Sequence, residues 1–187
     1  MKKWMGFVFV ALMLAVSVFG SVANAEAVSV EESPKVIYEA FFLDNDEILS
    51  LFDEVRGPEA PYGIMTQDFH VTTVYMPEED MHAFYGTKVT VRIYAYQAGE
   101  VPADDGSMTA NEGFFCTVTT DNAELQSFLD QLGKNWHITG SYKDQGGAKY
   151  TEYLDLNDAM PVEYTVTGYL GGYLSDGRFA FSPDLLQ

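Results

Sequence analysis

The sequence repeats one order of secondary-structure signals, and this repeat is the strongest constraint on the fold. In each half of the chain, a segment of strand-like composition is followed by a helix with a polar start, and then by further strand-like segments. The letters differ between the halves, so the repeat lies in the pattern alone. This order predicts an α+β protein with two pseudo-symmetric lobes, each an antiparallel sheet with a packed helix, around a central cleft.

Lobe one is expected over about residues 35–96. Its helix begins at a capping-box pair, Asp44 and Glu47, carries an apolar stripe and stops at Gly57. The alternation of β-branched and aromatic residues predicts its strands. They are expected at residues 35–42, 68–76 and 88–96.

Lobe two is expected over about residues 113–187. A second capping pair, Asp121 and Glu124, opens a helix that ends at Gly133. Strands are expected at residues 113–119, 136–142, 163–170 and 178–181, with a turn or bulge at Gly171-Gly172. The acidic, aperiodic stretch 97–112 is interpreted as a linker, so residues 35–187 would form a single bilobal domain.

The first residues of the chain have the layout of a secretory signal peptide. Two lysines precede an apolar run over residues 4–22, and an Ala-Asn-Ala triplet ends at residue 25. We therefore expect a signal peptide at 1–25, a flexible segment at 26–34, and a secreted protein or one placed in a periplasm or at the cell-envelope exterior. The alternative is a single membrane anchor, because the apolar run is close to spanning length.

Charge narrows the range of partners. The formal net charge of −18 becomes −20 once the two lysines of the signal peptide are removed. Such a surface repels polyanions, so we expect no binding of long nucleic acid and no stable membrane association after removal of the signal. The single cysteine, Cys116, excludes an intramolecular disulfide bond, and its alternation with apolar neighbours predicts a buried thiol.

Two of the three histidines stand in matching motifs. The motifs are His70-Val71-Thr72 and His137-Ile138-Thr139, each in the strand that follows a capped helix. Side chains two residues apart on a strand point the same way, so each motif presents an imidazole and a hydroxyl on one face. Two imidazoles can act as base and acid, and two hydroxyls can donate to phosphate oxygens, which is chemistry suited to cleaving a P–O bond without a metal.

These motifs and their placement resemble those of the two-histidine (2H) phosphoesterase superfamily, which includes LigT-like RNA 2′,3′-cyclic phosphodiesterases and the phosphodiesterase domains of tRNA ligases. The resemblance implies a bilobal fold, an acid–base pair of His70 and His137, and phosphate binding by Thr72 and Thr139. It implies a hydrolase that needs no cofactor and takes a small cyclic 2′,3′-type or 2′,5′-type phosphodiester, or a similar nucleotide-like substrate.

Two further residues are weaker candidates for substrate binding. Lys143 continues the face of the second motif and could approach a phosphate, and Tyr62 lies in a loop where it could stack on a base. Aspartates at 104–105 and at 155 and 158 offer oxygen ligands for calcium, but their spacing does not match the twelve-residue calcium loop. No metal site is therefore predicted.

Two other classes of protein also remain possible. The chain could be an exported binding module that holds a small ligand on the same scaffold without turnover, because a fold alone does not fix function. It could also be a cell-surface structural or adhesion domain, which would suit its acidity and its aromatic residues. The adhesion reading gives no reason for the paired motifs.

Overall fold

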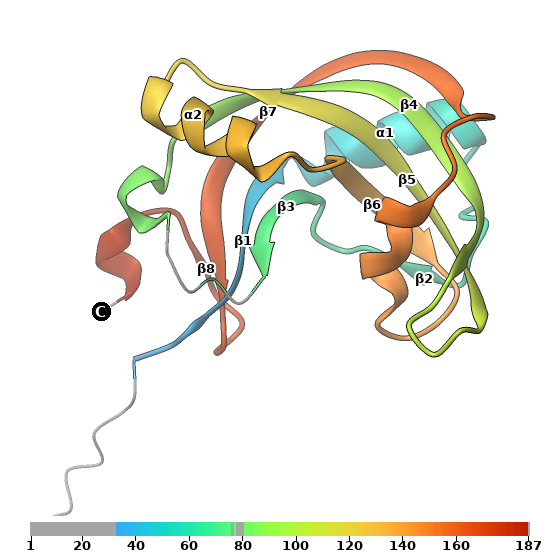
Figure 1. Cartoon of the computed structure of the whole chain (residues 1–187), viewed down its shortest axis with the longest axis horizontal. Helices are drawn as coiled ribbons and strands as arrows, with labels where there is room; N and C mark the ends of the chain where they lie inside the picture. Colours follow the sequence, from blue (N-terminus) through green and yellow to red (C-terminus); the bar gives the residue numbers. More distant parts are fainter. Residues whose placement is uncertain (1–32, 76, 78–80, 187) are drawn as a thin grey trace, which may run out of the picture. The chain divides into compact units, whose positions relative to one another are not determined.

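Antiparallel pairing joins eight strands into one sheet in the computed structural model, which describes residues 33–75, 77 and 81–186. The strands are β1 (Val36–Leu43), β2 (Ile64–Met65), β3 (His70–Tyr75), β4 (Lys88–Pro102), β5 (Met108–Thr119), β6 (His137–Tyr142), β7 (Met160–Leu174) and β8 (Phe179–Ala180). The helices are α1 (Asn45–Arg56) and α2 (Ala123–Leu132), with short 3-10 helices η1 (His82–Phe84), η2 (Gly147–Tyr153) and η3 (Pro183–Leu186). The chain is thus an α+β protein, as the sequence predicts (Figure 1).

The expected signal peptide at 1–25 lies outside the described residues, as does most of the expected flexible segment at 26–34. Residues 33–187 form one compact unit. Within the described part of that unit, no helix combines the length and the apolar character needed to cross a membrane.

The helix starts follow the sequence closely, with one difference. Asp44 caps α1 as expected, and its side chain accepts a hydrogen bond of 2.9 Å from the amide of Glu47. At α2 the cap is Asn122 and not the expected Asp121. Asn122 is extended and stands directly before the helix, so its side chain accepts from the amides of both Glu124 and Leu125.

The sheet runs continuously through both halves of the sequence. Its order is β2-β6-β5-β4-β7-β1-β3, with β8 added on β7. The late strand β7 lies between the two early strands β1 and β4, so strands of the second half complete the pairing of the first. Figure 1 shows β4, β5 and β7 arching over β1, β3 and β6.

Residues 97–112 are mostly strand, which corrects their interpretation as a linker. β4 and β5 remain paired out to Pro102 and Met108, and only the residues between them form the turn. An acidic composition is typical of an exposed loop, but several of these positions face inward. Val101 and Glu112, for example, are fully buried.

Gly171 and Gly172 lie within β7 and pair with β1, where the sequence predicted a turn or bulge. Their small size serves close packing on both sides. A Cβ at Gly172 would lie 2.3 Å from the hydroxyl of Tyr85, and one at Gly171 would lie 2.7 Å from the carbonyl oxygen of Ala180. The two glycines therefore let β8 and the η1 segment approach the strand.

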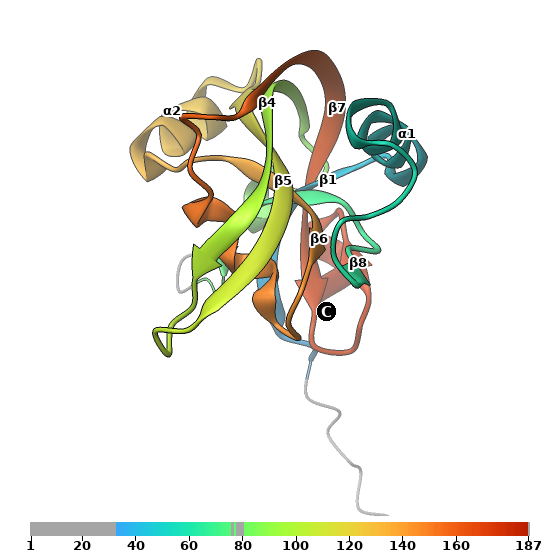
Figure 2. The same cartoon turned by 90° about the vertical axis from the view of Figure 1, so that its right-hand side faces the viewer.

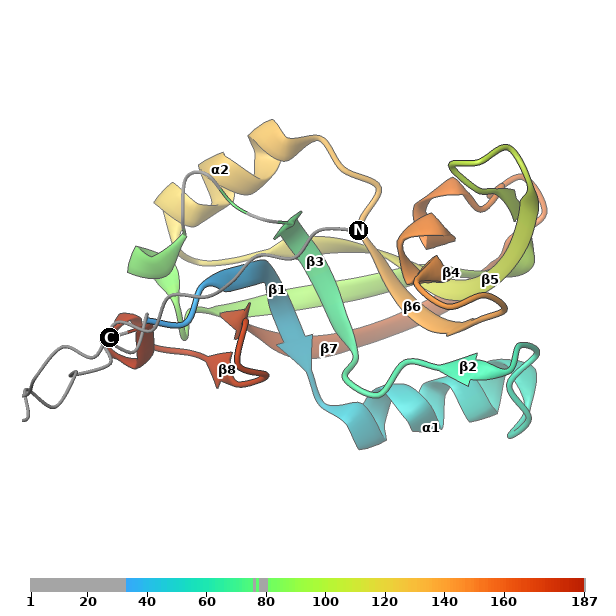
Figure 3. The same ribbon diagram turned by 90° about the horizontal axis from the view of Figure 1, so that it is seen from below.

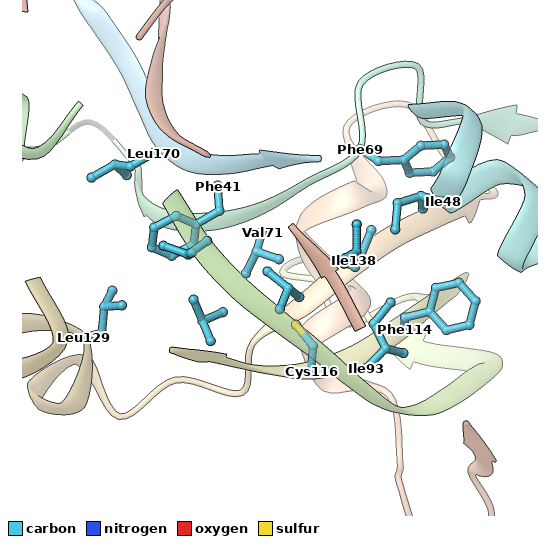
Figure 4. Packing of buried hydrophobic residues seen from close by; sticks show 14 of the residues in the cluster. Phe41, Ile48, Phe69, Val71, Ile93, Phe114, Cys116, Leu129, Ile138 and Leu170 are labelled. Carbon is cyan, nitrogen blue, oxygen red and sulfur yellow. The ribbon is translucent and has the colours of Figure 1, made fainter. Parts of the chain in front are cut away.

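The two helices lie on opposite sides of the strands, as Figures 2 and 3 show. The core lies between them and the sheet, and its labelled residues come from strands and helices alike (Figure 4). Ile48 of α1 and Leu129 of α2 belong to the same cluster as Phe41 and Cys116 of the sheet. Cys116 is 2% exposed, which confirms the predicted buried thiol.

A buried ion pair ties the end of α1 to β5. The Nε of Arg56 lies 3.0 Å from the Oε2 of Glu112, and the two side chains are 6% and 0% exposed. The hydroxyl of Tyr96 donates a 2.8 Å hydrogen bond to the same carboxylate oxygen. Removing one partner of such a pair leaves a buried charge uncompensated, so the pair holds α1 in register with the sheet.

Gly140 of β6 lies where α1 packs closely on the sheet. A Cβ at this position would lie 2.6 Å from the ring of Phe52 and 2.9 Å from the Cγ of Glu112. We expect Gly140→Ala to lower the free energy of unfolding by about 1–3 kcal/mol through overpacking. Urea unfolding measures the change, and Gly63→Ala is the matched control because a Cβ there meets nothing within 4 Å. Equal stability of both variants would contradict this packing.

Candidate functional site

The strands that carry the two His-x-Thr motifs approach each other in space. β3 is the last strand at one end of the sheet, whereas β6 pairs with β5 and β2 near the other end. Their Cα atoms nevertheless come within 8 Å of each other. The curvature of the sheet thus brings its two end regions together, with one motif on each side of the junction.

The middle residue of each motif points into the core. Val71 and Ile138 are both fully buried and belong to one apolar cluster (Figure 4). Because side chains alternate along a strand, the residues before and after them project to the opposite face. Those residues, the half-buried His70, Thr72, His137 and Thr139, are the ones that the sequence singled out.

Both imidazoles are held in the same way. The Nδ1 of His70 lies 2.7 Å from the carbonyl oxygen of Asp68, and the Nδ1 of His137 lies 3.1 Å from that of Asn135. A carbonyl oxygen only accepts, so each Nδ1 carries the proton and donates it. In the neutral ring this leaves the lone pair on Nε2, which is the arrangement that a general base needs.

The surroundings keep both rings neutral near pH 7. Burial lowers the pKa of His70, and the charge of His137 lowers it further, against the opposing effect of the Asp68 carbonyl. Burial is also the main cause that lowers the pKa of His137, with the Asn135 carbonyl and Glu152 opposing it. The charge of His137 is thus one of the causes that set the pKa of His70.

Aromatic side chains pack beside His70. The ring of Tyr38 stacks on the imidazole at a centroid distance of 5.0 Å and on Tyr173 at 5.1 Å. Phe42 lies 5.8 Å from the same imidazole. Burial raises the pKa of Tyr38 to about 12, with Tyr173 and Asp68 contributing. Sequence reasoning missed Tyr38, because its neighbours come from β7 and β3.

The two threonines differ in their hydrogen bonds. The hydroxyl of Thr139 lies 3.2 Å from the carbonyl oxygen of Ala148 and 3.0 Å from the hydroxyl oxygen of Thr151. The carbonyl only accepts, so Thr139 donates its single hydrogen to η2. The hydroxyl of Thr72 makes no hydrogen bond to any described residue. Thr72 is therefore the hydroxyl that is ready to donate to a ligand.

The weaker candidates lie elsewhere. Lys143 lines a cavity of about 630 Å³ together with Asp104, Asp105 and Asp144. The amide of Tyr62 donates to the hydroxyl of Ser141 at 3.3 Å. Within the described residues, neither Lys143 nor Tyr62 forms a hydrogen bond, ion pair or ring contact with His70 or His137.

Burial raises the pKa of Tyr62, and so do the charges of Glu112 and Glu100. The charge of Glu112, which is paired with Arg56, therefore acts on the phenol group of Tyr62. Among the residues that the structure describes, no three or more His, Cys, Asp or Glu side chains lie together in a way that could hold a metal ion.

Lys134 is a second residue that sequence reasoning missed. It lies in the loop between α2 and β6, and its ammonium group donates a hydrogen bond to the carbonyl oxygen of Thr73 on β3. Its charge also lowers the pKa of His137. A lysine in a polar loop gives no sequence signal of such a contact, which depends on how β3 and β6 meet.

Comparisons with models of protein families, with curated proteins and with solved structures found no match. The site combines two imidazoles in the same tautomer, a cation at Lys134, and a Thr72 hydroxyl that bonds to none of the described residues.

The lowered pKa values of both histidines predict a pH dependence of stability. The folded state binds these protons less readily than the unfolded chain, so stability is lost as the pH falls below the ordinary value of 6.5 towards the folded pKa values. We expect the double variant His70→Gln and His137→Gln to lose less unfolding free energy than the wild type between pH 7.5 and pH 5.5.

Urea unfolding at the two pH values measures this difference. The carboxylates titrate in both proteins, so the comparison isolates the histidines. An equal loss of stability in the wild type and the double variant would show that the imidazoles are not held neutral.

Proposed function

We propose that this protein is an exported phosphodiesterase that hydrolyses a small cyclic 2′,3′-type or 2′,5′-type phosphodiester without requiring a metal ion. His70 and His137 are its acid–base pair, and Thr72 and Thr139 are its phosphate-binding residues. The proposal includes a 2H-type arrangement of two lobes whose His-x-Thr motifs face one substrate.

One observation carries the proposal: two imidazoles from distant parts of the chain are held in the same neutral tautomer. Each donates from Nδ1 to a carbonyl oxygen two residues earlier. The same contact thus recurs in both motifs. It leaves two Nε2 atoms for proton transfer, which is what hydrolysis of a phosphodiester requires.

In the proposed reaction, water attacks phosphorus and one P–O ester bond breaks. The Nε2 of one histidine takes a proton from the water as the new P–O bond forms, and the other histidine gives a proton to the leaving ribose oxygen. The second histidine must therefore be protonated beforehand. The negative charge of the bound phosphodiester favours this protonation, because a nearby anion raises the pKa of an imidazole.

The hydroxyl of Thr72 can donate to a non-bridging oxygen of the phosphate, since no described residue uses its hydrogen. Thr139 must first give up its bond to the carbonyl of Ala148. This commitment of Thr139 favours a second candidate function, in which the site holds a small phosphodiester without turnover. Measured turnover decides between the two.

We expect the purified mature protein to hydrolyse 2′,3′-cyclic nucleotides in the presence of EDTA. His70→Ala and His137→Ala should each lower kcat/KM by about 10²- to 10⁴-fold, which is the usual contribution of a general acid or base. A panel of cyclic and linear phosphodiesters, assayed by product release, measures the effect.

His82→Ala is the matched control, because His82 lies in η1 near the buried Glu39 and outside the motifs. Full activity of both motif variants would refute the assignment. Binding of the cyclic nucleotides with no hydrolysis by the wild type would instead select the binding module.

The unequal hydrogen bonding of the threonines predicts unequal losses. Thr72→Val should lower kcat/KM by about 10- to 100-fold, the usual loss for a hydrogen bond to a charged group. Thr139→Val should cost less, because the wild-type hydroxyl already donates within the protein. Steady-state kinetics on one cyclic nucleotide measures both variants. A larger loss in Thr139→Val than in Thr72→Val would contradict the assignment of Thr72 as the free donor.

A further inference from the structure

A phosphodiester is an anion, and this acidic protein has few cations to meet it. The chain has ten Lys and Arg residues, of which two lie outside the described part. Four of the others form ion pairs with carboxylates: Arg56, Arg92, Lys149 and Arg178. The four that form no such pair within the described residues are Lys35, Lys88, Lys134 and Lys143.

Among these four, Lys134 is the one beside the paired motifs. Its ammonium group donates to the carbonyl oxygen of Thr73, the residue that follows Thr72 on β3. Its charge acts on the pKa of His137, three residues later in the chain. Lys134 thus lies just before β6, and its side chain bonds to β3.

The state of the Lys134 side chain suits the binding of an anion. An ammonium group has three hydrogens, and the carbonyl of Thr73 accepts one of them, which leaves two donors. Partial burial lowers the pKa of Lys134, with Glu152 acting in the opposite direction. In such a partly dry setting, attraction between opposite charges is stronger than in bulk water.

Lys143, which the sequence suggested for this role, has different surroundings. It lines a cavity with Asp104, Asp105, Asp144 and Lys149. Lys149 is paired with Asp104, so the other two aspartates remain to disfavour the approach of a phosphate.

The geometry points to Lys134 as the residue that recognises the negative charge of the phosphodiester bound at His70 and His137. This inference rests on the function proposed above. The carbonyl of Thr73 positions the ammonium group at the junction of β3 and β6, which leaves two of its hydrogens to donate to a bound anion. Lys134 therefore selects anionic diesters over neutral esters of similar shape.

Two variants separate the charge of Lys134 from its tie to β3. Lys134→Met removes both, whereas Lys134→Gln keeps a donor for the Thr73 carbonyl and removes only the charge. We expect both variants to weaken the binding of inorganic phosphate by about 10- to 100-fold, the range for a charge-assisted hydrogen bond. Lys134→Arg, which keeps the charge, should stay much closer to the wild type. Phosphate titration followed by the imidazole NMR signals measures the binding.

Turnover of 2′,3′-cyclic AMP gives a second readout. KM should rise more than kcat falls in Lys134→Met, because the interaction with the anion is already present in the bound ground state. Lys88→Met is the matched control, because Lys88 is an exposed lysine of β4, and it should leave both constants unchanged. Thermal unfolding of every variant checks that the fold is intact.

A third readout needs no ligand. Removing the positive charge of Lys134 should raise the pKa of His137 more than it changes the pKa of His70, because Lys134 acts on His137 directly and on His70 only through the charge of His137. An NMR titration of the two imidazoles measures this selective shift. A merely structural role would not produce the same shift in both Lys134→Met and Lys134→Gln.

The outcomes distinguish this inference from the proposed function. Wild-type turnover together with unchanged phosphate binding in Lys134→Met and Lys134→Gln would overturn the role of Lys134 alone. An equal loss in Lys88→Met would do the same. A wild-type protein that neither binds phosphate nor cleaves any cyclic phosphodiester would overturn both proposals.

Discussion

The burial of Val71 and Ile138 in one core is the interaction on which the candidate site depends. These residues come from strands near the two ends of the sheet, and both are fully buried. Because side chains alternate along a strand, burying these two residues places the neighbouring imidazoles on the opposite face of each strand. The face is thus set by apolar packing, and the tautomers are then set by two local carbonyl oxygens.

The sequence predicted what depends on neighbouring residues. The α+β class, the cap at Asp44, the buried thiol of Cys116 and the shared face of each His-x-Thr motif all follow from spacings of two to four residues. Such local patterns can be interpreted without knowing how the rest of the chain folds. They were sufficient to find the two histidines.

The sequence did not predict what depends on distant residues. The paired strands at 97–112 look like a linker because Glu112 is buried against Arg56, a partner from α1. The insertion of β7 between β1 and β4 has no local signal, and neither does the contact of Lys134 with Thr73. The unequal hydrogen bonds of the two threonines also stay hidden, because η2 decides them.

The position of β7 also bears on when the domain can form. β1 and β4 each need β7 to complete their pairing, and β7 is synthesised after both of them. A growing chain therefore holds two early strands with unfilled edges, and its closure waits for contacts between remote segments, which are slow to form. Until β7 has been made and has paired with both strands, the two early parts of the sheet have no strand that joins them.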